Sequence, residues 1–467
     1  MTVTEIAPSC PAVAPAPGRP AVGALLPVVG ASTTVPLVDG TQRVYANLDY
    51  AASAPALQAV ADRVAEVLPL YASVHRGAGY LSQVSTALYE AARQTIARFV
   101  GARADDVAVV TRNTTDSLNL LASVVPGRVL VLDLEHHANL LPWVHASRGE
   151  HRTTILPIEA TVEGTLASLA VELAQQPFAL VTVTGASNVT GESLPLDRVV
   201  AIAHAAGARV AVDGAQLVPH RRFSLQESGV DYVAFSGHKT YAPFGAGALV
   251  GRRDWLDVGT PYLAGGGAVR DVRADRTVWQ PAPARHEAGS PNVVGAIALA
   301  QACDTLAALP GGALEAHEAA LRDRLVDGLR GVEGVAVARI WPDSTDPVGV
   351  VTFTVPGHDA GLVAAYLAAE HGIGVRDGRF CAHPLLAHLG ASGGAVRASV
   401  GVGSTSEWVD RLVGGVAAYL DEGPSARYEV VDGCWAVVDD SRPLIAVGGL
   451  DHLAATAAAA CGPALDD

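Results

Sequence analysis

Lys239 is the residue of this chain best suited to covalent chemistry. It lies in Ser236-Gly237-His238-Lys239, between an apparent strand (231–235) and a glycine-rich turn, in a chain where lysine is scarce. A lysine held among small residues at a strand end can lose its proton and form a Schiff base with an aldehyde. The plain alternative is a surface lysine in a turn. The strand just upstream (209–213) favours the chemical interpretation, because it ends in Asp213, an acid that could keep the ring nitrogen of a pyridine-type cofactor protonated.

Polar residues also follow other apparent strands. Thr114 and Thr115 open a helix whose N–H groups could bind a phosphate, although an ordinary threonine N-cap explains them too. His136 could stack on a flat ring or act as an acid or base; adjacent histidines seldom face one metal ion, and no carboxylate cluster supports a metal site. Asn188 could simply satisfy a turn. Because ligands of such sheets lie at the carboxyl ends of the strands, we expect these residues, Asp213 and Lys239 to share one site.

Strands alternate with helices through much of the chain. The spacing of apolar residues predicts amphipathic helices over 55–70 and 80–100. Short β-branched runs predict strands at 107–111, 129–134, 153–156, 180–184, 209–213, 231–235 and 246–250. Helices are predicted between several of them, near 116–123, 140–148, 168–175 and 196–206. This alternation is typical of an α/β fold with a mostly parallel sheet covered on both faces.

We place the strands and helices of the α/β fold in a large domain at 43–309, and we expect its N-terminal segment to contribute to a small domain. The remaining segments predict smaller units. A Pro-, Ala- and Val-rich start (1–42) predicts a flexible arm, either disordered or loosely docked. A small α+β domain (310–423) is predicted from helices at 313–329, 360–370 and 406–420 and strands at 335–340 and 348–355. The extension (424–467) contains apolar runs around Asp432-Gly433, which predict a hairpin, then a run at 444–448 and an alanine-rich helix at 452–460.

Composition argues against several functional classes. Half of the 467 residues are hydrophobic and 17% are charged, which suits a large packed interior. The net charge of −15 argues against a nucleic-acid-binding surface and a polybasic membrane patch. No apolar run has the length and flanks of a membrane span or of a signal peptide. The five cysteines are far apart and lack metal-site spacing, so we expect reduced thiols, no metal and a cytoplasmic location.

Eight motifs between about residue 48 and about residue 420 are specific in combination. They are Leu48-Asp49-Tyr50-Ala51-Ala52, Val74-His75-Arg76-Gly77, Arg112-Asn113-Thr114-Thr115, Glu135-His136-His137-Ala138-Asn139, Ser187-Asn188-Val189, Val212-Asp213-Gly214-Ala215-Gln216, Ser236-Gly237-His238-Lys239 and Arg285-His286-Glu287-Ala288-Gly289-Ser290-Pro291-Asn292. With them the chain resembles the class V aminotransferase superfamily of fold-type I enzymes, which use pyridoxal 5′-phosphate (PLP). It is most similar to the cysteine desulfurase and selenocysteine lyase branch.

The resemblance implies roles for the residues of these motifs. Lys239 would bind the cofactor covalently, Asp213 would pair with its ring nitrogen, and His136 would stack on the ring and move protons. The ring hydroxyl would lie near Gln216 and Asn188. The phosphate would be held by Thr114 or Thr115, Ser236 and His238, and by a Ser290 that reaches across the interface of a homodimer. Substrate contacts are expected from Asn188, His75 and Arg76.

The second domain contains the residues that would select the reaction. Cys381 stands where the desulfurase nucleophile lies in the family, and the neighbouring Arg376 and Arg379 would favour its thiolate. A lone cysteine is otherwise more often a small buried hydrophobe. Arg397 resembles the arginine that binds the substrate carboxylate with its planar fork. The chain departs from the family pattern at Arg379-Phe380, where histidines are expected, at Gly401-Val402-Gly403-Ser404 and at Ala242.

The resemblance therefore implies a cysteine desulfurase-like enzyme that converts L-cysteine to alanine and leaves a persulfide on Cys381. Its expected partners are a small amino acid, a second subunit and a sulfur-acceptor protein. One alternative keeps the cofactor in another class V enzyme, a C–S lyase, selenocysteine lyase or epimerase acting on a larger amino acid. A scaffold built on a degraded enzyme fold is disfavoured, because Lys239 and Asp213 are both present.

Overall fold

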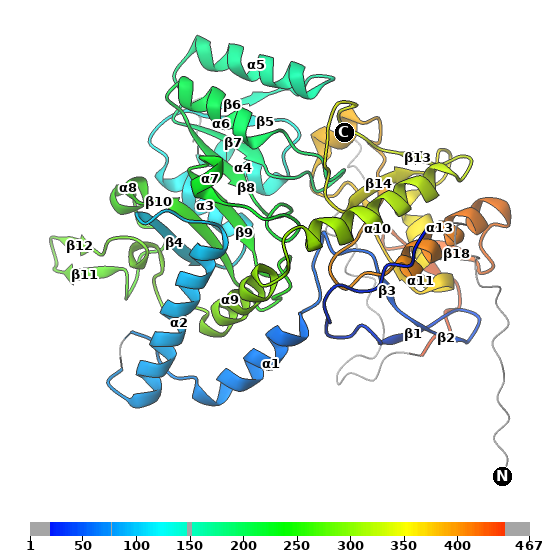
Figure 1. Ribbon diagram of the computed structural model, residues 1–467, viewed down its shortest axis with the longest axis horizontal. Coiled ribbons are helices and arrows are strands. Elements are labelled where there is room, and N and C mark those ends of the chain that lie inside the picture. The colour runs from blue at the N-terminus through cyan, green and yellow to red at the C-terminus, as the bar shows by residue number, and fades with distance from the viewer. Residues whose placement is uncertain (1–18, 76, 147–151, 444–467) are drawn as a thin grey trace.

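A seven-stranded sheet forms the centre of the large domain in the computed structural model, which describes residues 19–75, 77–146 and 152–443 (Figure 1). β10 is antiparallel to both of its neighbours, and the other adjacent strands run parallel. The predicted α/β fold with a mostly parallel sheet is confirmed. The strands, in order across the sheet, are β4 (Asp106–Thr111), β10 (Gly247–Arg252), β9 (Tyr232–Ser236), β8 (Arg209–Asp213), β7 (Leu180–Thr184), β5 (Val129–Leu132) and β6 (Thr153–Leu156).

The directions of the strands show which of their ends lie at the same edge of the sheet. Since β4 is antiparallel to β10, it runs in the same direction as β9. The carboxyl ends of β4, β5, β7, β8 and β9 therefore lie at one edge of the sheet. The loops that follow these five strands meet there, as expected for a ligand site in an α/β fold.

Alternate side chains of the strands other than edge strand β6 pack into two separate cores, one on each face of the sheet. In β9, Tyr232 and Ala234 face one core, and Val233 and Phe235 face the other. The first core is closed by α3 (Thr114–Val124), α4 (His137–Ala146) and α8 (Arg253–Val258). The second is closed by α1 (Gln58–Val67), α2 (Tyr80–Phe99), α5 (Val162–Gln175), α6 (Leu196–Ala205), α7 (Leu225–Ser228) and α9 (Val293–Ala307).

Helix α9 is absent from the sequence prediction. Most of its side chains are buried, from Val293 to Leu306, and it packs against α1 and α2. A helix buried on nearly all sides has no polar face, so it lacks the periodic pattern by which the amphipathic helices were predicted.

The small domain contains a four-stranded antiparallel sheet covered by helices, to the right in Figure 1. Strand β15 (Ile373–Gly374) pairs in parallel with β3 (Ala46–Asn47), so the N-terminal segment joins this domain. β17 and the short helix α12 (His383–His388) were not predicted. The sheet order is β13 (Ala336–Val337), β14 (Val350–Thr354), β17 (Ala395–Ser399) and β16 (Arg376–Gly378), and the helices are α10 (Ala313–Arg330), α11 (Ala360–His371) and α13 (Ser406–Asp421).

Residues 19–42 contact the rest of the chain, and the predicted flexibility of this arm stays a prediction. The N–H groups of Leu25 and Leu26 donate to Val402 O at 2.7 and 3.1 Å. The hairpin of β1 (Thr34–Pro36) and β2 (Gln42–Val44) follows. These contacts join residues that are far apart in the chain, and local composition gives no sign of them. Residues 1–18 of the predicted arm lie outside the described residues.

The predicted C-terminal hairpin is confirmed. β18 (Tyr428–Val431) pairs with β19 (Cys434–Val437), and the turn residues Asp432 and Gly433 have φ of 51° and 81°. The hairpin is anchored on α11, where Tyr428 Oη donates to Glu370 at 2.9 Å. The apolar run at 444–448 and the helix at 452–460 lie outside the described residues.

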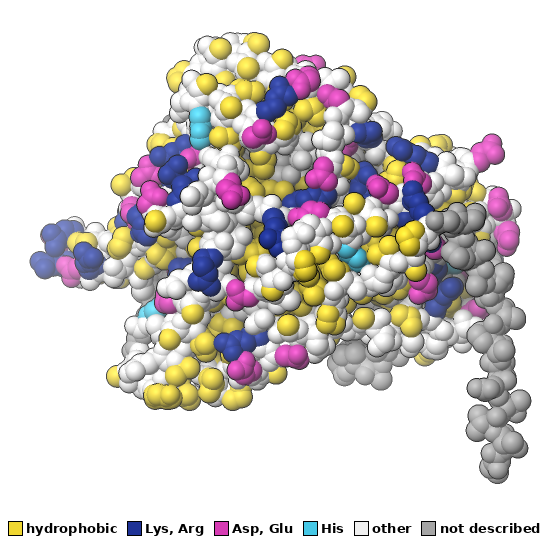
Figure 2. All heavy atoms as spheres, in the orientation of Figure 1, with side chains coloured by type: hydrophobic (Ala, Val, Ile, Leu, Met, Phe, Trp, Pro, Cys, Tyr) yellow, Lys and Arg dark blue, Asp and Glu magenta, His cyan; other side chains and the backbone are white. Residues whose placement is uncertain are grey.

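A second hairpin, β11 (Val269–Val272) and β12 (Thr277–Trp279), projects from the large domain at the left of Figure 1. Figure 2 shows basic side chains gathered at its tip, where Arg273 and Arg276 are exposed and pair with Asp271. Within the described ranges, no helix is both long enough and apolar enough to cross a membrane.

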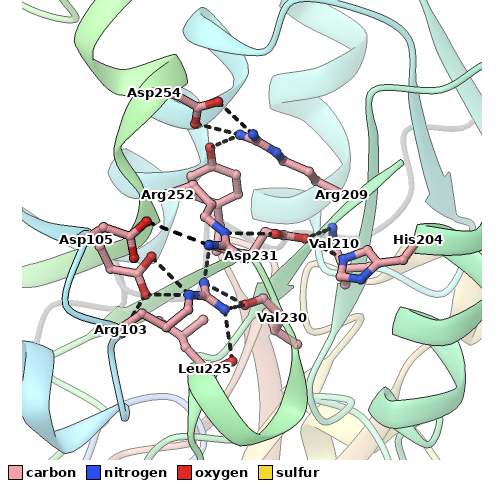
Figure 3. Close-up of polar contacts among 12 residues, drawn as sticks. Arg103, Asp105, His204, Arg209, Val210, Leu225, Val230, Asp231, Arg252 and Asp254 are labelled. Carbon is pink, nitrogen blue, oxygen red and sulfur yellow. Dashed lines mark hydrogen bonds and ion pairs between the residues drawn. The ribbon is translucent and has the colours of Figure 1, made fainter. Parts of the chain in front are cut away.

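Ion pairs connect the elements at the amino-terminal ends of β8 and β9, the edge opposite the converging loops (Figure 3). The buried carboxylate of Asp231 accepts hydrogen bonds from His204 Nε2 at 2.8 Å, Val210 N at 3.0 Å and Arg252 Nε at 3.3 Å. Arg209 binds Asp254 through two hydrogen bonds of 2.8 and 2.7 Å. These contacts hold β8 and β9 together at the end that carries no predicted site residue.

Candidate functional site

A cavity of about 270 Å³ lies where the five strand ends meet the small domain. Most of the predicted site residues line it: Thr114, Thr115, His136, Asn188, Asp213, Gln216, Ser236, His238, Lys239, Cys381 and Arg397. The first nine come from the large domain and the last two from the small domain. The expectation that polar residues after separate strands share one site therefore agrees with their placement.

The end of the cavity next to α3 is rich in hydrogen-bond donors. Thr114 N donates to Ser236 Oγ at 2.8 Å, and the hydroxyls of these two residues lie 2.6 Å apart. Asn113 caps α3 by accepting from Asp116 N at 2.9 Å. Burial lowers the pKa of His238 to about 4, so its imidazole is neutral near pH 7. A helix N-terminus with adjacent hydroxyls provides the donors that a phosphate requires.

Lys239 and Asp213 place an amine and a carboxylate on the same cavity wall. Burial lowers the pKa of Lys239 to about 8, with Asp213 opposing the shift. Burial also raises the pKa of Asp213. Two neighbours oppose this shift: Ala215 N, which donates a hydrogen bond of 3.0 Å to Asp213 Oδ1, and Lys239. Lys239 is the only lysine among the 467 residues. The site therefore holds an amine that is partly neutral, and hence nucleophilic, near physiological pH.

His136 is held as a neutral imidazole. Its Nδ1 accepts the Ala138 N–H at 3.0 Å, which leaves the ring proton on Nε2. Burial, followed by the nearby Lys239, lowers the pKa of His136 to about 3. The fully buried Glu135 beside it accepts from Asn139 Nδ2 at 2.7 Å and Thr184 N at 2.9 Å, tying the ends of β5 and β7 together. His136 can thus stack and donate a hydrogen bond, but it is a weak base.

Cys381 lies in a short loop that joins β16 to α12 and is docked against the large domain. Cys381 O accepts from His137 N at 2.8 Å, and Phe380 O accepts from Asn188 Nδ2 at 2.8 Å. Phe380 and Cys381 both have positive φ, 52° and 53°, a region that non-glycine residues rarely occupy. The two hydrogen bonds hold this unusual backbone with the thiol on the cavity wall.

Arg397 presents a buried guanidinium to the cavity from β17. Its Nη1 donates to Asn188 O and its Nη2 to Asp49 Oδ1, both at 2.9 Å. Its Nε is buried without a hydrogen-bond partner. Burial lowers the pKa of Arg397, while Asp49 opposes that shift. An unpaired buried donor beside a positive charge is suited to an anionic ligand such as a carboxylate.

Two predicted site residues, both described by the structure, do not line the cavity of their own chain. His75 is exposed, and its Nε2 lies 2.9 Å from Glu90 Oε1. Ser290 is exposed on the loop that precedes α9. Arg76 lies outside the described residues. The roles of His75 and Ser290 remain predictions, and for Ser290 the predicted place is across a dimer interface.

Two residues of the site had no assigned role in the sequence analysis. Asp49 forms an ion pair with Arg397, and Phe380 covers the Arg397 guanidinium with its ring. Both were visible in the sequence, Asp49 within a family motif and Phe380 as a departure from one. Nothing local to either residue indicates a contact with β17.

The chemistry of the cavity fits a phosphorylated pyridine aldehyde. The α3 end offers phosphate donors, Asp213 offers an acid for a ring nitrogen, and Lys239 offers an amine for an aldehyde. Gln216 Nε2 donates to Ala51 O at 2.8 Å, while its Oε1 is buried and has no partner. That unpaired oxygen needs a donor which a bound group would supply. Among the described residues, no cluster of histidine, cysteine or acidic side chains is arranged to hold a metal ion.

Comparison with known proteins agrees with this architecture. The model of the family Aminotransferase class-V matches residues 46–412. The chain is 38% identical to the cysteine desulfurase of Dickeya dadantii, over 81% of this chain and 92% of that protein. It is 35% identical to a probable cysteine desulfurase of Vibrio cholerae, over 82% of this chain and 95% of that protein.

Two solved structures extend the similarity to three dimensions. The cysteine desulfurase CsdA of Escherichia coli, in its S-sulfonic acid form, matches with a TM-score of 0.73 and 35% identity, covering 81% of this chain and 95% of that one. The apo cysteine desulfurase of Thermococcus onnurineus NA1 matches with a TM-score of 0.73 and 34% identity, covering 80% and 94%. This chain therefore belongs to the aminotransferase class-V family of enzymes, in its cysteine desulfurase-like branch.

Proposed function

We propose that this protein is a PLP-dependent cysteine desulfurase that converts L-cysteine to alanine and retains the sulfur as a persulfide on Cys381. The observation that best supports this proposal is the meeting of Lys239, Cys381 and Arg397 on the walls of one cavity, although they come from two domains. An amine, a thiol and a guanidinium are the three groups that this reaction requires from the protein.

The large domain would hold the cofactor. Lys239 would bind its aldehyde, Asp213 would pair with its ring nitrogen, and the hydroxyls and N–H groups at the start of α3 would bind its phosphate. Thr114, Ser236 and His238 are the proposed phosphate contacts, with Thr115 beside them. When bound, PLP supplies an electron sink for the α-carbon of an amino acid.

Lys239 is the group that we propose moves the substrate α-proton. Its pKa of about 8 makes the amine both a usable base and, once protonated, a usable acid near neutral pH. His136 is less suited to this task, because burial lowers its pKa to about 3 and its Nδ1 is occupied by Ala138 N–H. Its proposed role is to stack on the cofactor ring.

The small domain would bind and cleave the substrate. The Arg397 guanidinium, which lines the cavity, would bind the α-carboxylate. The Cys381 thiolate would attack the substrate sulfur, so that an S–S bond forms and the C–S bond breaks. The electron pair stays with the substrate carbon, which takes up a proton and becomes the methyl group of alanine. The sulfur passes from one thiol to another, and no external oxidant is needed.

Two partners complete the proposal. A homodimer would bring Ser290 of the partner subunit toward the phosphate end of the cavity, since Ser290 is exposed and lies outside the cavity of its own chain. A thiol-bearing acceptor protein would then remove the persulfide sulfur from Cys381.

The test is to incubate the holoenzyme with L-cysteine and measure alanine and protein-bound persulfide. We expect equal amounts of both in the first turnover, and neither from Cys381→Ser. Cys434→Ser is the matched control, because Cys434 lies on the C-terminal hairpin, and it should behave as the wild type. Wild-type holoenzyme that makes no alanine would refute the proposal. Activity that survives in Cys381→Ser would favour a C–S lyase, which needs no sulfur nucleophile.

A further inference from the structure

Phe380 lies between the two functional residues of the small domain. It immediately precedes Cys381 in the chain, and its ring centroid lies 5.1 Å from Cζ of Arg397. The side chain is 3% exposed and forms part of the cavity wall. A guanidinium at this distance from an aromatic face is attracted by the ring and is held by it.

The contacts of Arg397 fix the orientation of its guanidinium at the cavity wall. Nη1 and Nη2 are directed to Asn188 O and Asp49 Oδ1, the Phe380 ring covers the group, and Nε has no partner. Because the Phe380 ring covers one face of the guanidinium, we expect an anion to pair with Arg397 in the guanidinium plane. In-plane approach is the geometry in which arginine binds a carboxylate through two parallel hydrogen bonds.

Phe380 also connects Arg397 to the loop that carries the Cys381 thiol. Phe380 O accepts from Asn188 Nδ2 at 2.8 Å, and the Asn188 carbonyl accepts from Arg397. Asn188 thus bridges the Cys381 loop and Arg397 through its side chain and its backbone. A shift of Phe380 would move the guanidinium and the start of the Cys381 loop together.

We propose that Phe380 is a positioning residue that orients Arg397 for the substrate α-carboxylate. The inference rests on the proposed function for the identity of the substrate, but the carboxylate contact itself can be tested without desulfuration. The phenyl ring adds no hydrogen-bond donor that would compete with Arg397 for the carboxylate. A flat ring is the required feature, so a side chain of similar bulk without a ring should not replace it.

The experiment compares Phe380→Leu, which keeps bulk and removes the ring, with Phe380→Tyr, which keeps the ring. Holoenzymes are titrated with L-alanine and with L-alaninamide, which lacks the carboxylate, and binding is followed in the visible spectrum. We expect Phe380→Leu to weaken L-alanine binding by about 3- to 30-fold and to leave L-alaninamide binding within about twofold. Phe380→Tyr should bind both within about twofold of the wild type. The KM for L-cysteine should rise in Phe380→Leu in parallel with the L-alanine dissociation constant.

Equal weakening for both ligands, or no weakening for either, would overturn the proposal, because the effect would not pass through the carboxylate. Phe380→Met, an unbranched side chain, provides a second ring-free variant if Phe380→Leu does not fold, and the same outcomes apply to it. A wild-type enzyme that binds L-alanine but does not desulfurate L-cysteine would refute the proposed function and leave this comparison intact.

Discussion

Asp49 and Arg397 are 348 residues apart in the chain, yet Asp49 Oδ1 accepts a hydrogen bond of 2.9 Å from Arg397 Nη2. Asp49 belongs to the segment that enters the large domain, and Arg397 lies on β17 of the small domain. The pair therefore joins the two domains at the cavity wall, and it gives the buried guanidinium one nearby negative charge.

Replacing Asp49 by asparagine should destabilise the protein, because a buried guanidinium would lose the negative charge that it pairs with. Arg397 is 4% exposed and Asp49 is 24% exposed, so water cannot fully take over the contact. We expect Asp49→Asn to lower the free energy of unfolding in urea by about 1–3 kcal/mol. Asp254→Asn is the control: its pair with Arg209 lies at the surface, with Asp254 57% exposed, and should cost at most about 1 kcal/mol. Equal losses in the two variants would contradict this account.

The rate at which the apoenzyme binds PLP should follow the deprotonation of Lys239. Burial lowers the pKa of Lys239 to about 8, so roughly a tenth of the amine is neutral at pH 7 and about half at pH 8. The neutral amine is the reactive form, so we expect the rate to rise about fivefold from pH 7 to 8 and less than about twofold from pH 8 to 9. An ordinary lysine would instead give about a tenfold rise over each of these units.

Borohydride reduction followed by peptide mapping measures this rate at a single side chain, because Lys239 is the only lysine of the chain. Lys239→Ala should take up no label on a side chain and show no Schiff-base absorption band after free PLP has been removed. A rate that keeps rising about tenfold per pH unit through pH 9 would show that the Lys239 pKa is not lowered.

The sequence predicted the large domain and its site better than the small domain, for physical reasons. Strands β6, β7 and β8 were predicted to the residue, because each is a short β-branched run bounded by turn or helix signals. Asn188 lies in the loop after β7 and Asp213 ends β8, and their meeting follows from parallel strand direction alone. In contrast, α9 has no polar face, and β17 is a short buried strand, so neither shows a periodic pattern. The contacts of Arg397 with Asp49 and Phe380 depend on how two domains pack, which no local pattern reports.

A homodimer with Ser290 acting across the interface should show complementation between two impaired variants. We expect sedimentation to give twice the 47.8 kDa chain mass. Ser290→Ala should weaken PLP binding, and Lys239→Ala should abolish activity. In a mixed dimer, the Ser290→Ala subunit keeps its own Lys239 and receives an intact Ser290 of the partner subunit, so one normal site forms.

The measurement is PLP affinity and activity after the two variants are mixed under conditions that exchange subunits. Recovery of one wild-type site per mixed dimer is expected. If Ser290 acted within its own chain, mixing would recover nothing, and if the chain were a monomer, mixing would have no effect at any concentration.

Removing the Asp231 carboxylate should destabilise the protein without changing its site. Asp231 accepts from His204, Val210 N–H and Arg252 at the amino-terminal end of β9, whereas Lys239 follows the other end of the same strand (Figure 3). Asp231→Ala would leave a buried N–H and a guanidinium without their acceptor, so we expect a loss of about 2–4 kcal/mol in the free energy of unfolding. Asp105→Ala is the matched control, since Asp105 is 77% exposed and 3.9 Å from Arg252, and it should change stability by less than about 0.5 kcal/mol. Both variants should retain the wild-type KM for L-cysteine at a temperature where they are folded. A raised KM in Asp231→Ala would contradict this prediction, because it would mean that the ion pairs at this edge of the sheet affect the cavity through β9.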